Sequence, residues 1–361
     1  MVSPSYGSFG DLHDKILSGE LLEREDGLRL YESDDLFSLG ALARFVKERL
    51  HGKKVFYAAN LHINYTNICA SNCAFCSFSR FPGDTGTYLL SPEEIGAKLQ
   101  SVLKKWPLNE IHMVGGHHPE VGLDYYLKVL KMIRQISPAL FIKAFAAPEI
   151  DFISKKEGIS WRETLRRLQE AGLNSLPGGG AEIFSPGVRN KICPDKISGE
   201  EWLQIHETAH DLGLPTNATM LYGHIEKPED RVDHVLRLRE LQEKTHGFFA
   251  FVPLAYQNQG DKLNQKECGG ILDLKVHAVS RLLLTNIPHL KIHWVGTGLK
   301  LAQAALSFGV DDFGGIHLEE KIFSEKGREN GGFESLEEFE FLIRQAGCEP
   351  CLANSAYGVV E

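Results

Sequence analysis

Short apolar runs alternate with longer amphipathic stretches from about residue 61 to the end of the chain. The short runs are rich in β-branched and aromatic residues, which is typical of buried strands. Eight strands are predicted, at Leu61–Tyr65, Glu110–Val114, Phe141–Phe145, Leu173–Leu176, Thr216–Tyr222, Phe248–Leu254, Lys291–Val295 and Val310–Phe313. Between them, apolar residues recur at helical spacing. Strands that alternate with helices predict a parallel sheet.

Several helical stretches begin with a recognisable cap. Ser91, Ser160 and Ser198 each stand three residues before a glutamate, which is the pattern of a capping box. Two further helices are predicted at Pro228–Lys244 and Ser335–Ala346. Eight strand and helix units favour a (β/α)8 TIM-type barrel over a doubly wound sheet. In such a barrel, functional residues follow the carboxyl ends of the strands.

The domain organisation follows from the same pattern. A polar, helix-rich lead precedes the first strand, and no low-complexity tract or charge run marks a linker. We therefore expect an N-terminal helical cap segment over residues 1–55 and a β/α barrel with a C-terminal helix over residues 56–361.

Composition narrows the range of functions. The 361 residues are 43% hydrophobic and 24% charged, which is typical of a folded globular protein. A net charge of −9 argues against binding to nucleic acid or anionic lipid. The start of the chain lacks the basic and apolar regions of a signal peptide, and the longest near-apolar run, Phe248–Tyr256, is too short to span a membrane. We expect a cytoplasmic protein with no membrane partner.

Three of the seven cysteines form the most specific motif. Cys69, Cys73 and Cys76 follow the first predicted strand in a C-x3-C-x2-C pattern. A structural zinc site or a group of buried thiols is the alternative, and zinc would need a fourth ligand, for which Cys348 and Cys351 are candidates. Three thiolates on a tight loop can instead hold three irons of a 4Fe–4S cluster and leave one iron open to a ligand.

This motif resembles that of the radical S-adenosylmethionine superfamily. The resemblance implies that the open iron binds the amino and carboxylate groups of S-adenosylmethionine, and that an electron from the cluster cleaves it to methionine and a 5′-deoxyadenosyl radical. It also implies that Phe75 packs near the adenine and that Gly115 and Gly116 approach the methionine amino group through backbone. Glu182 is a candidate for the ribose hydroxyls or the sulfonium; a carboxylate facing a helix dipole is the alternative.

Longer segments resemble a narrower family, the aminofutalosine synthases of the futalosine route to menaquinone. The matching segments are Asn64–Cys69, His112–Gly116, Lys143–Ile150, Ser175–Ile183, Lys191–Asp195, Asn217–Ile225 and Arg231–Glu243. The related dehypoxanthine futalosine cyclases share the segment from Leu176 to Glu182. His112–Pro119, Lys143–Ile150 and Lys191–Asp195 favour the synthase.

The synthase resemblance implies addition of the adenosyl radical to the double bond of 3-(1-carboxyvinyloxy)benzoate. Rearrangement and loss of the carboxyl carbon as carbon dioxide or bicarbonate then give 6-amino-6-deoxyfutalosine. S-adenosylmethionine is a co-substrate, and a low-potential flavodoxin or ferredoxin is the expected electron donor. The alternatives are the cyclase, another hydrogen-abstracting enzyme of the superfamily, and a non-catalytic metal-binding barrel.

A substrate with two carboxylates needs cationic or hydrogen-bonding partners. Tyr222 and His224 end the fifth predicted strand and share one face, so we expect them to contact substrate or manage protons. His118, after the second strand, is the third candidate catalytic residue. His62, Asn64 and Thr66 also share one strand face, although the sequence does not decide whether that face points inward.

Overall fold

Nine strands form three parallel sheets of three strands each in the computed structural model, which describes residues 6–258, 260–322, 333 and 335–358. The strands are β1 (Lys54–Ala58), β2 (Asn60–Ile63), β3 (Glu110–Met113), β4 (Phe141–Ala144), β5 (Thr216–Tyr222), β6 (Phe248–Ala255), β7 (His289–Leu290), β8 (Asp312–Gly315) and β9 (Glu349–Leu352). The sheet orders are β2–β3–β4, β5–β6–β7 and β8–β1–β9.

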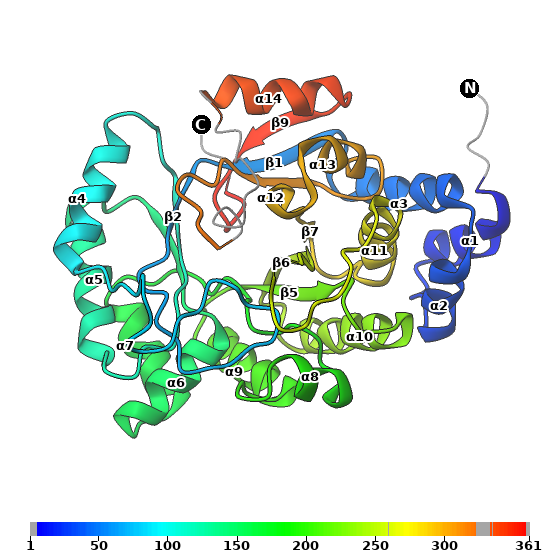
Figure 1. Cartoon of the computed structure of the whole chain (residues 1–361). Helices are drawn as coiled ribbons and strands as arrows, with labels where there is room; N and C mark the ends of the chain where they lie inside the picture. Colours follow the sequence, from blue (N-terminus) through cyan, green and yellow to red (C-terminus); the bar gives the residue numbers. More distant parts are fainter. Residues whose placement is uncertain (1–5, 259, 323–332, 334, 359–361) are drawn as a thin grey trace.

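The three sheets surround a common interior, and the helices lie outside them (Figure 1). Isolated parallel bridges link neighbouring sheets. Ser175 pairs with Lys143 of β4 and Leu176 with Thr216 of β5, while Lys291, just after β7, pairs with Asp312 of β8. The predicted parallel α/β fold is confirmed. The predicted closed eight-stranded barrel is not confirmed, because no sheet closes on itself within the described residues.

Two predicted strands account for much of this difference. The predicted strand Leu173–Leu176 is present only as bridges at Ser175 and Leu176. Where a strand is predicted at Lys291–Val295, the two-residue β7 ends first and a helical turn begins at Trp294. Glycines at positions 296 and 298 follow directly, and glycine weakens a strand because it offers no side chain to pack.

The strands β1 and β9 lie outside the eight predicted ones. They pair with each other in parallel from Lys54 and Glu349 onward. β9 carries Pro350 and no alternation of apolar and polar residues, so its sequence lacks the usual strand signal.

The helices of the sheet region are α4 (Pro92–Leu103), α5 (Leu123–Ile136), α6 (Ala147–Glu157), α7 (Trp161–Glu170), α8 (Pro186–Ile192), α9 (Gly199–Asp211), α10 (Pro228–Thr245), α11 (Gly270–Leu283), α12 (Trp294–Thr297), α13 (Leu299–Ala305) and α14 (Leu336–Gln345). All three serines are helix caps, since Ser91, Ser160 and Ser198 each accept a hydrogen bond from the backbone N–H three residues later. The full capping box is present at Ser91 and Ser198.

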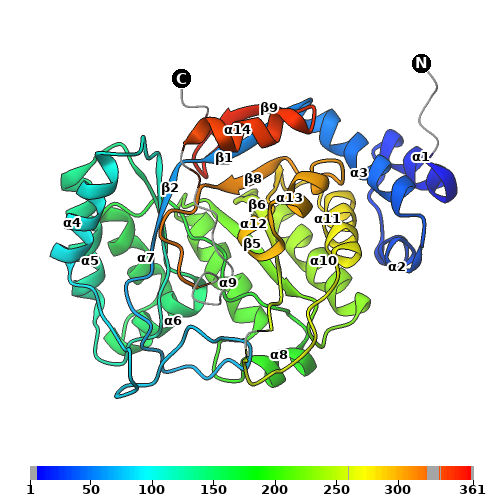
Figure 2. The ribbon, with the colours of Figure 1, turned by 45° about the horizontal axis from the view of Figure 1, so that its top comes forward.

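The lead of the chain is helical, as predicted. A short 3-10 turn, η1 (Gly7–Phe9), precedes α1 (Gly10–Ser18), α2 (Arg24–Glu32) and α3 (Leu36–His51). α3 packs against α11, and α2 packs against α10 and α11. These helices therefore lie on one flank of the molecule (Figure 2). The division of the chain at residues 55 and 56 stays a prediction.

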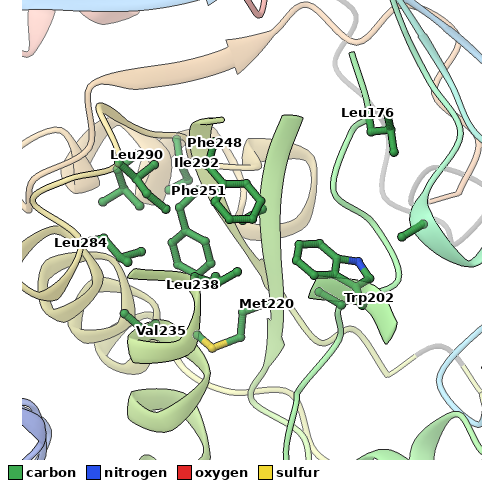
Figure 3. Close-up of a cluster of buried hydrophobic side chains, with 14 of the residues drawn as sticks. Leu176, Trp202, Met220, Val235, Leu238, Phe248, Phe251, Leu284, Leu290 and Ile292 are labelled. Carbon is green, nitrogen blue, oxygen red and sulfur yellow. The ribbon is translucent and has the colours of Figure 1, made fainter. Parts of the chain in front are cut away.

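The hydrophobic core lies between the sheets and the helices. Figure 3 shows its part beside β5 and β6, where Met220, Phe248 and Phe251 meet side chains of α9 and α10. Trp202 of α9 is fully buried there, and its indole N–H donates to the carbonyl of Gly179. Because this apolar layer lies outside the sheet, the inward face of the strands is free to carry polar residues. Among the described residues, no helix has the length and apolar character that crossing a bilayer requires.

Candidate active site

The cysteine loop follows β2 and is fixed by backbone hydrogen bonds at both ends. The N–H of Cys69 donates to the carbonyl of Arg80 at 2.9 Å, and the N–H of Ala74 donates to Ile192 at 2.7 Å. All seven cysteines are free thiols. Burial raises the pKa of the Cys73 thiol to about 12, so the thiolate form needs a nearby positive charge such as iron.

The glycine turn after β3 lies directly against the cysteine loop. The N–H of Gly116 donates to Thr66 at 3.0 Å, and the N–H of His117 points to the Cys69 sulfur at 3.4 Å. A Cβ atom at Gly116 would lie 2.2 Å from the carbonyl oxygen of Ile68, and one at Gly115 would lie 2.6 Å from the Tyr65 ring. Only glycine allows this approach. The predicted contact of these glycines with the methionine amino group stays a prediction.

Phe75 and Glu182 share a partner that the sequence did not reveal. The ammonium of Lys196 lies 2.7 Å from a carboxylate oxygen of Glu182 and 5.4 Å from the centre of the Phe75 ring. Burial alone would lower the pKa of Lys196, but electrostatic interaction with the acidic groups of Cys73 and Glu182 outweighs burial and raises it. Glu182 holds a left-handed backbone with φ of 47°, a conformation that is costly for a residue with a side chain.

A cavity of about 310 Å³ joins this loop to the interior of the sheets. Its wall includes all seven predicted cluster and cofactor residues: Cys69, Cys73, Cys76, Phe75, Gly115, Gly116 and Glu182. Apolar side chains such as Val114, Leu221 and Leu254 line part of the wall as well. The structure therefore brings together every residue predicted to hold the cluster or S-adenosylmethionine.

We call the end of the cavity at the cysteine loop the mouth, and a polar group at the strands the floor. The floor consists of His62, His112, Lys143, Lys291, His293 and His317. His62, His112 and Lys143 lie side by side, because they are paired in register on β2, β3 and β4. Branched aliphatic residues usually fill the interior of a parallel β/α assembly. A layer of titratable side chains in their place indicates a polar ligand.

The two lysines of the floor are paired with buried acids. The Lys143 ammonium lies 2.7 Å from Glu110 and donates to the Ser355 hydroxyl at 2.6 Å, while the Lys291 ammonium lies 3.0 Å from Asp312. Burial alone would raise the pKa of the Glu110 carboxyl, but Lys143 and Lys291 outweigh burial and lower it. The floor therefore holds buried charges of both signs in close pairs.

The four histidines of the floor are neutral near pH 7. Burial lowers the pKa of His62 to about 3 and that of His293 to about 4. Burial also takes the pKa values of His112 and His317 well below the usual value. A neutral imidazole donates one hydrogen bond and accepts one. These side chains can therefore orient a polar ligand without adding charge.

The three predicted catalytic residues lie outside the cavity wall. The Tyr222 hydroxyl donates to Asp273 at 2.6 Å, His224 contacts the Leu221 carbonyl at 3.1 Å, and His118 accepts from the N–H of Glu120 at 3.2 Å. None of the three is among the residues that line the cavity. Their catalytic roles stay predictions, and each has a structural partner instead.

Polar residues at every second position are the sequence pattern from which the floor could have been predicted. One residue separates Asn60 from His62 on β2 and Glu110 from His112 on β3, which places both members of each pair on one strand face. Lys291 and His293 have the same spacing just after β7. Asn217 and Thr219 on β5 repeat the pattern and line the same cavity. Of the three residues whose direction the sequence left undecided, His62 lines the cavity, whereas Asn64 and Thr66 do not.

The zinc alternative finds no support in the described part of the chain. There, the one group of three potential ligands whose donor atoms converge within 4.8 Å is His51, His289 and Asp311, which excludes the cysteine loop. Cys348 and Cys351 do not line the cavity. Among the described cysteines, Cys69, Cys73 and Cys76 line the cavity. Three thiols beside a glycine turn that admits close approach fit a cluster with one open iron.

Comparison with known proteins gives this fold and cysteine loop a class. Residues 63–238 match the radical SAM superfamily, and residues 245–361 match the CofH/MqnC C-terminal region. The solved structures of methylornithine synthase and of HydG, a maturase of the FeFe-hydrogenase, share the fold. For methylornithine synthase the TM-score is 0.77 at 18% identity, and the match covers 96% of this chain and 98% of that one. For HydG the TM-score is 0.79 at 16% identity, with 98% of this chain and 78% of that one covered. The chain belongs to the radical SAM superfamily and is an enzyme that uses a 4Fe–4S cluster and S-adenosylmethionine.

Curated relatives narrow the resemblance. The aminodeoxyfutalosine synthase of Thermus thermophilus is 42% identical over 96% of this chain and 95% of its own length. The aminodeoxyfutalosine synthase of Streptomyces coelicolor is 44% identical over 97% of this chain and 94% of its own length. The 5-amino-6-(D-ribitylamino)uracil–L-tyrosine 4-hydroxyphenyl transferase of Methanopyrus kandleri is 36% identical over 99% of both chains.

Proposed function

We propose that this enzyme joins the 5′-deoxyadenosyl group of S-adenosylmethionine to 3-(1-carboxyvinyloxy)benzoate. The products are 6-amino-6-deoxyfutalosine, methionine and bicarbonate or carbon dioxide, in menaquinone biosynthesis. The observation that carries the proposal is one cavity with the cysteine loop at its mouth and a polar floor at its depth. The names of the two bacterial relatives support it.

When bound, the cluster and S-adenosylmethionine supply a carbon-centred radical for addition to a double bond. The side chains of Cys69, Cys73 and Cys76 would hold the cluster, and the glycine turn would leave room for the methionine end of the cofactor. Glu182, fixed by Lys196, would bind the ribose hydroxyls, with Phe75 against the adenine. These residues all lie at the mouth of the cavity.

The remaining residues would bind and orient the aromatic co-substrate. Val114, Leu221 and Leu254 give the wall an apolar section for a benzene ring. The floor supplies hydrogen-bond donors for a carboxylate. Enclosure by these walls would also exclude water and other hydrogen donors from the reacting carbon atoms. A low-potential flavodoxin or ferredoxin would deliver the electron in the cytoplasm, and nucleic acid would play no part.

The second candidate is the transfer of a tyrosine side chain, which the printed name of the Methanopyrus relative describes. Its support is the 36% identity over nearly the whole of both chains. The cyclase and other hydrogen-abstracting reactions are further alternatives. They differ from the main proposal in the fate of the adenosyl carbons.

Labelled S-adenosylmethionine separates these reactions. The purified protein is reconstituted anaerobically with iron and sulfide, reduced, and incubated with S-adenosylmethionine labelled in the adenosyl carbons and with 3-(1-carboxyvinyloxy)benzoate. We expect the label in a product that also contains the benzoate ring. Free 5′-deoxyadenosine formed in step with product would instead show hydrogen abstraction. Turnover only with tyrosine and the ribitylaminouracil would support the second candidate.

A further inference from the structure

At the floor, a backbone N–H determines which atoms donate and which accept in a series of hydrogen bonds. The N–H of Gly315 donates to Nε2 of His317 at 3.2 Å. A backbone N–H can only donate, so Nε2 of His317 accepts and its proton is on Nδ1. Nδ1 of His317 lies 2.7 Å from Nε2 of His62. His317 therefore donates to His62.

The consequence for His62 is a defined tautomer. Because its Nε2 accepts from His317, the proton of the neutral ring is on Nδ1. The amide nitrogen of Asn60, 3.4 Å from the same Nε2, is also a donor and agrees with this assignment. Within the described residues, Nδ1 of His62 has no hydrogen-bond partner, although the ring lines the cavity. One N–H is thus available to a ligand.

The surrounding backbone holds this arrangement rigidly. His317 has a left-handed φ of 48°, and its N–H donates to the Asn60 carboxamide oxygen at 2.9 Å. A Cβ atom at Gly315 would lie 2.2 Å from that oxygen. The His62 ring is stacked on His112, with centroids 4.5 Å apart and planes 9° apart. A strained backbone held by its neighbours is typical of a functional position.

The lysines of the floor are less available than His62. Lys143 already contacts Glu110 and Ser355, and Lys291 contacts Asp312. A carboxylate that took over one of these cations would leave a buried acid unpaired, which is costly. The N–H of His62 can be used without breaking an existing bond.

We propose that His62 donates its Nδ1–H to the aromatic carboxylate of the substrate, and that His317 is a positioning residue that keeps the proton of His62 on that atom. This assignment rests on the proposed function. The enol-ether double bond must lie at the mouth, beside the residues that hold S-adenosylmethionine. The ring carboxylate then extends toward the floor.

Two variants of His62 test the donor separately from the shape of the side chain. In His62→Asn the amide nitrogen can take the place of Nδ1, whereas in His62→Gln the amide reaches the position of Nε2. Binding is measured by calorimetry on the anaerobic, cluster-loaded protein, with 3-(1-carboxyvinyloxy)benzoate and with (1-carboxyvinyloxy)benzene, which lacks the ring carboxylate.

For His62→Gln we expect Kd for the benzoate to rise about 10- to 100-fold, the range expected for one hydrogen bond to a charged group, with Kd for the analogue unchanged. His62→Asn should stay within about threefold of the wild type for both compounds. His317→Leu should weaken benzoate binding, and His317→Asn, which keeps a donor near Nδ1, should restore it. His206→Gln, at a buried histidine outside the cavity wall, is the control for folding.

Three results would overturn the assignment. The first is an equal loss of affinity for the benzoate and for the analogue, and the second is an equal loss of benzoate affinity in the two His62 variants. The third is unchanged benzoate binding in His62→Gln. Failure of the proposed function gives a different result. In that case the wild type would bind the benzoate without converting it, while the difference between the His62 variants would persist.

Discussion

The two ends of the cavity differ in how their residues are distributed along the chain. The mouth is built from short contiguous segments, with Cys69, Cys73 and Cys76 on one loop and Gly115 and Gly116 on one turn. The floor takes one residue from each of β2, β3 and β4, and the rest from the segments that follow β7 and β8. Local spacing therefore reveals the mouth, whereas only the folded sheets assemble the floor.

This difference also separates two kinds of chemistry. The mouth carries the residues with which a radical SAM enzyme holds its cluster, and one fold can serve enzymes with many different substrates. The floor carries paired lysines and neutral histidines that no cluster needs. Substrate choice is therefore expected to depend on the floor, and substitutions at the two ends should have separable effects.

Loss of a cluster ligand should have the largest effect. In Cys73→Ala the loop keeps two thiolates, so we expect no stable 4Fe–4S cluster and a loss of S-adenosylmethionine cleavage of at least about 1,000-fold. Cluster absorption and iron content, measured after anaerobic reconstitution, check this. Cys351→Ala, on β9 and outside the cavity wall, should load the cluster as the wild type does. A Cys73→Ala protein with full iron content would show that the ligands lie elsewhere.

A break in the floor should affect stability more than cluster loading. Lys143→Met leaves Glu110 buried without its main partner, and an uncompensated buried charge costs about 3–5 kcal/mol. Urea unfolding of the cluster-free protein should show this loss in the free energy of unfolding. Lys155→Met removes a lysine that is 70% exposed and paired with Asp151, and should change stability by less than about 1 kcal/mol. Equal effects of the two substitutions would mean that the floor pair is not structurally important.

The sequence predicted the parts of the fold that depend on local pattern. The bounds of β5 agree with the prediction at both ends, and the caps at Ser91, Ser160 and Ser198 are confirmed. The cysteines, the glycines and Glu182 were predicted from short motifs, and all of them line the cavity. β9 was missed because its pairing with β1 joins segments that are nearly 300 residues apart. No local pattern contains that information.

The candidate catalytic residues failed to reach the cavity for a related reason. Tyr222 and His224 were selected as the end of a strand, and the sequence alone does not give the direction of their side chains. In the structure, Thr219 and Leu221 line the cavity and Tyr222 faces Asp273 of α11. Alternation along the strand therefore assigns the opposite face to Tyr222.

Glu149, which lines the cavity, allows a test of how stability depends on pH. Burial raises the pKa of its carboxyl from 4.5 to about 7, although hydrogen bonds from Tyr65 and Ala146 oppose the shift. The folded protein therefore keeps a proton that the unfolded chain loses between about pH 4.5 and pH 7. Stability should fall by about 1–3 kcal/mol as pH rises through this range.

The variant Glu149→Gln isolates that contribution, since its amide does not titrate. Urea unfolding at several pH values should show a smaller decline for the variant than for the wild type between pH 4.5 and pH 7. Parallel curves for the two proteins would mean that the carboxyl is not protonated in the folded state at these pH values.

The smallest expected effect is at Tyr222, a residue that the sequence predicts to be catalytic and that the structure places outside the cavity wall. Tyr222→Phe removes the hydrogen bond to Asp273 and should cost about 1–2 kcal/mol of stability. Because the hydroxyl points away from the cavity wall, the turnover rate should stay within about twofold of the wild type. Tyr125→Phe is the matched control, since its hydroxyl donates to the Leu90 carbonyl at 2.6 Å outside the cavity. If Tyr222→Phe alone slowed turnover by about two orders of magnitude, the catalytic role predicted from the sequence would be supported, and the Tyr222 side chain would have to face the substrate.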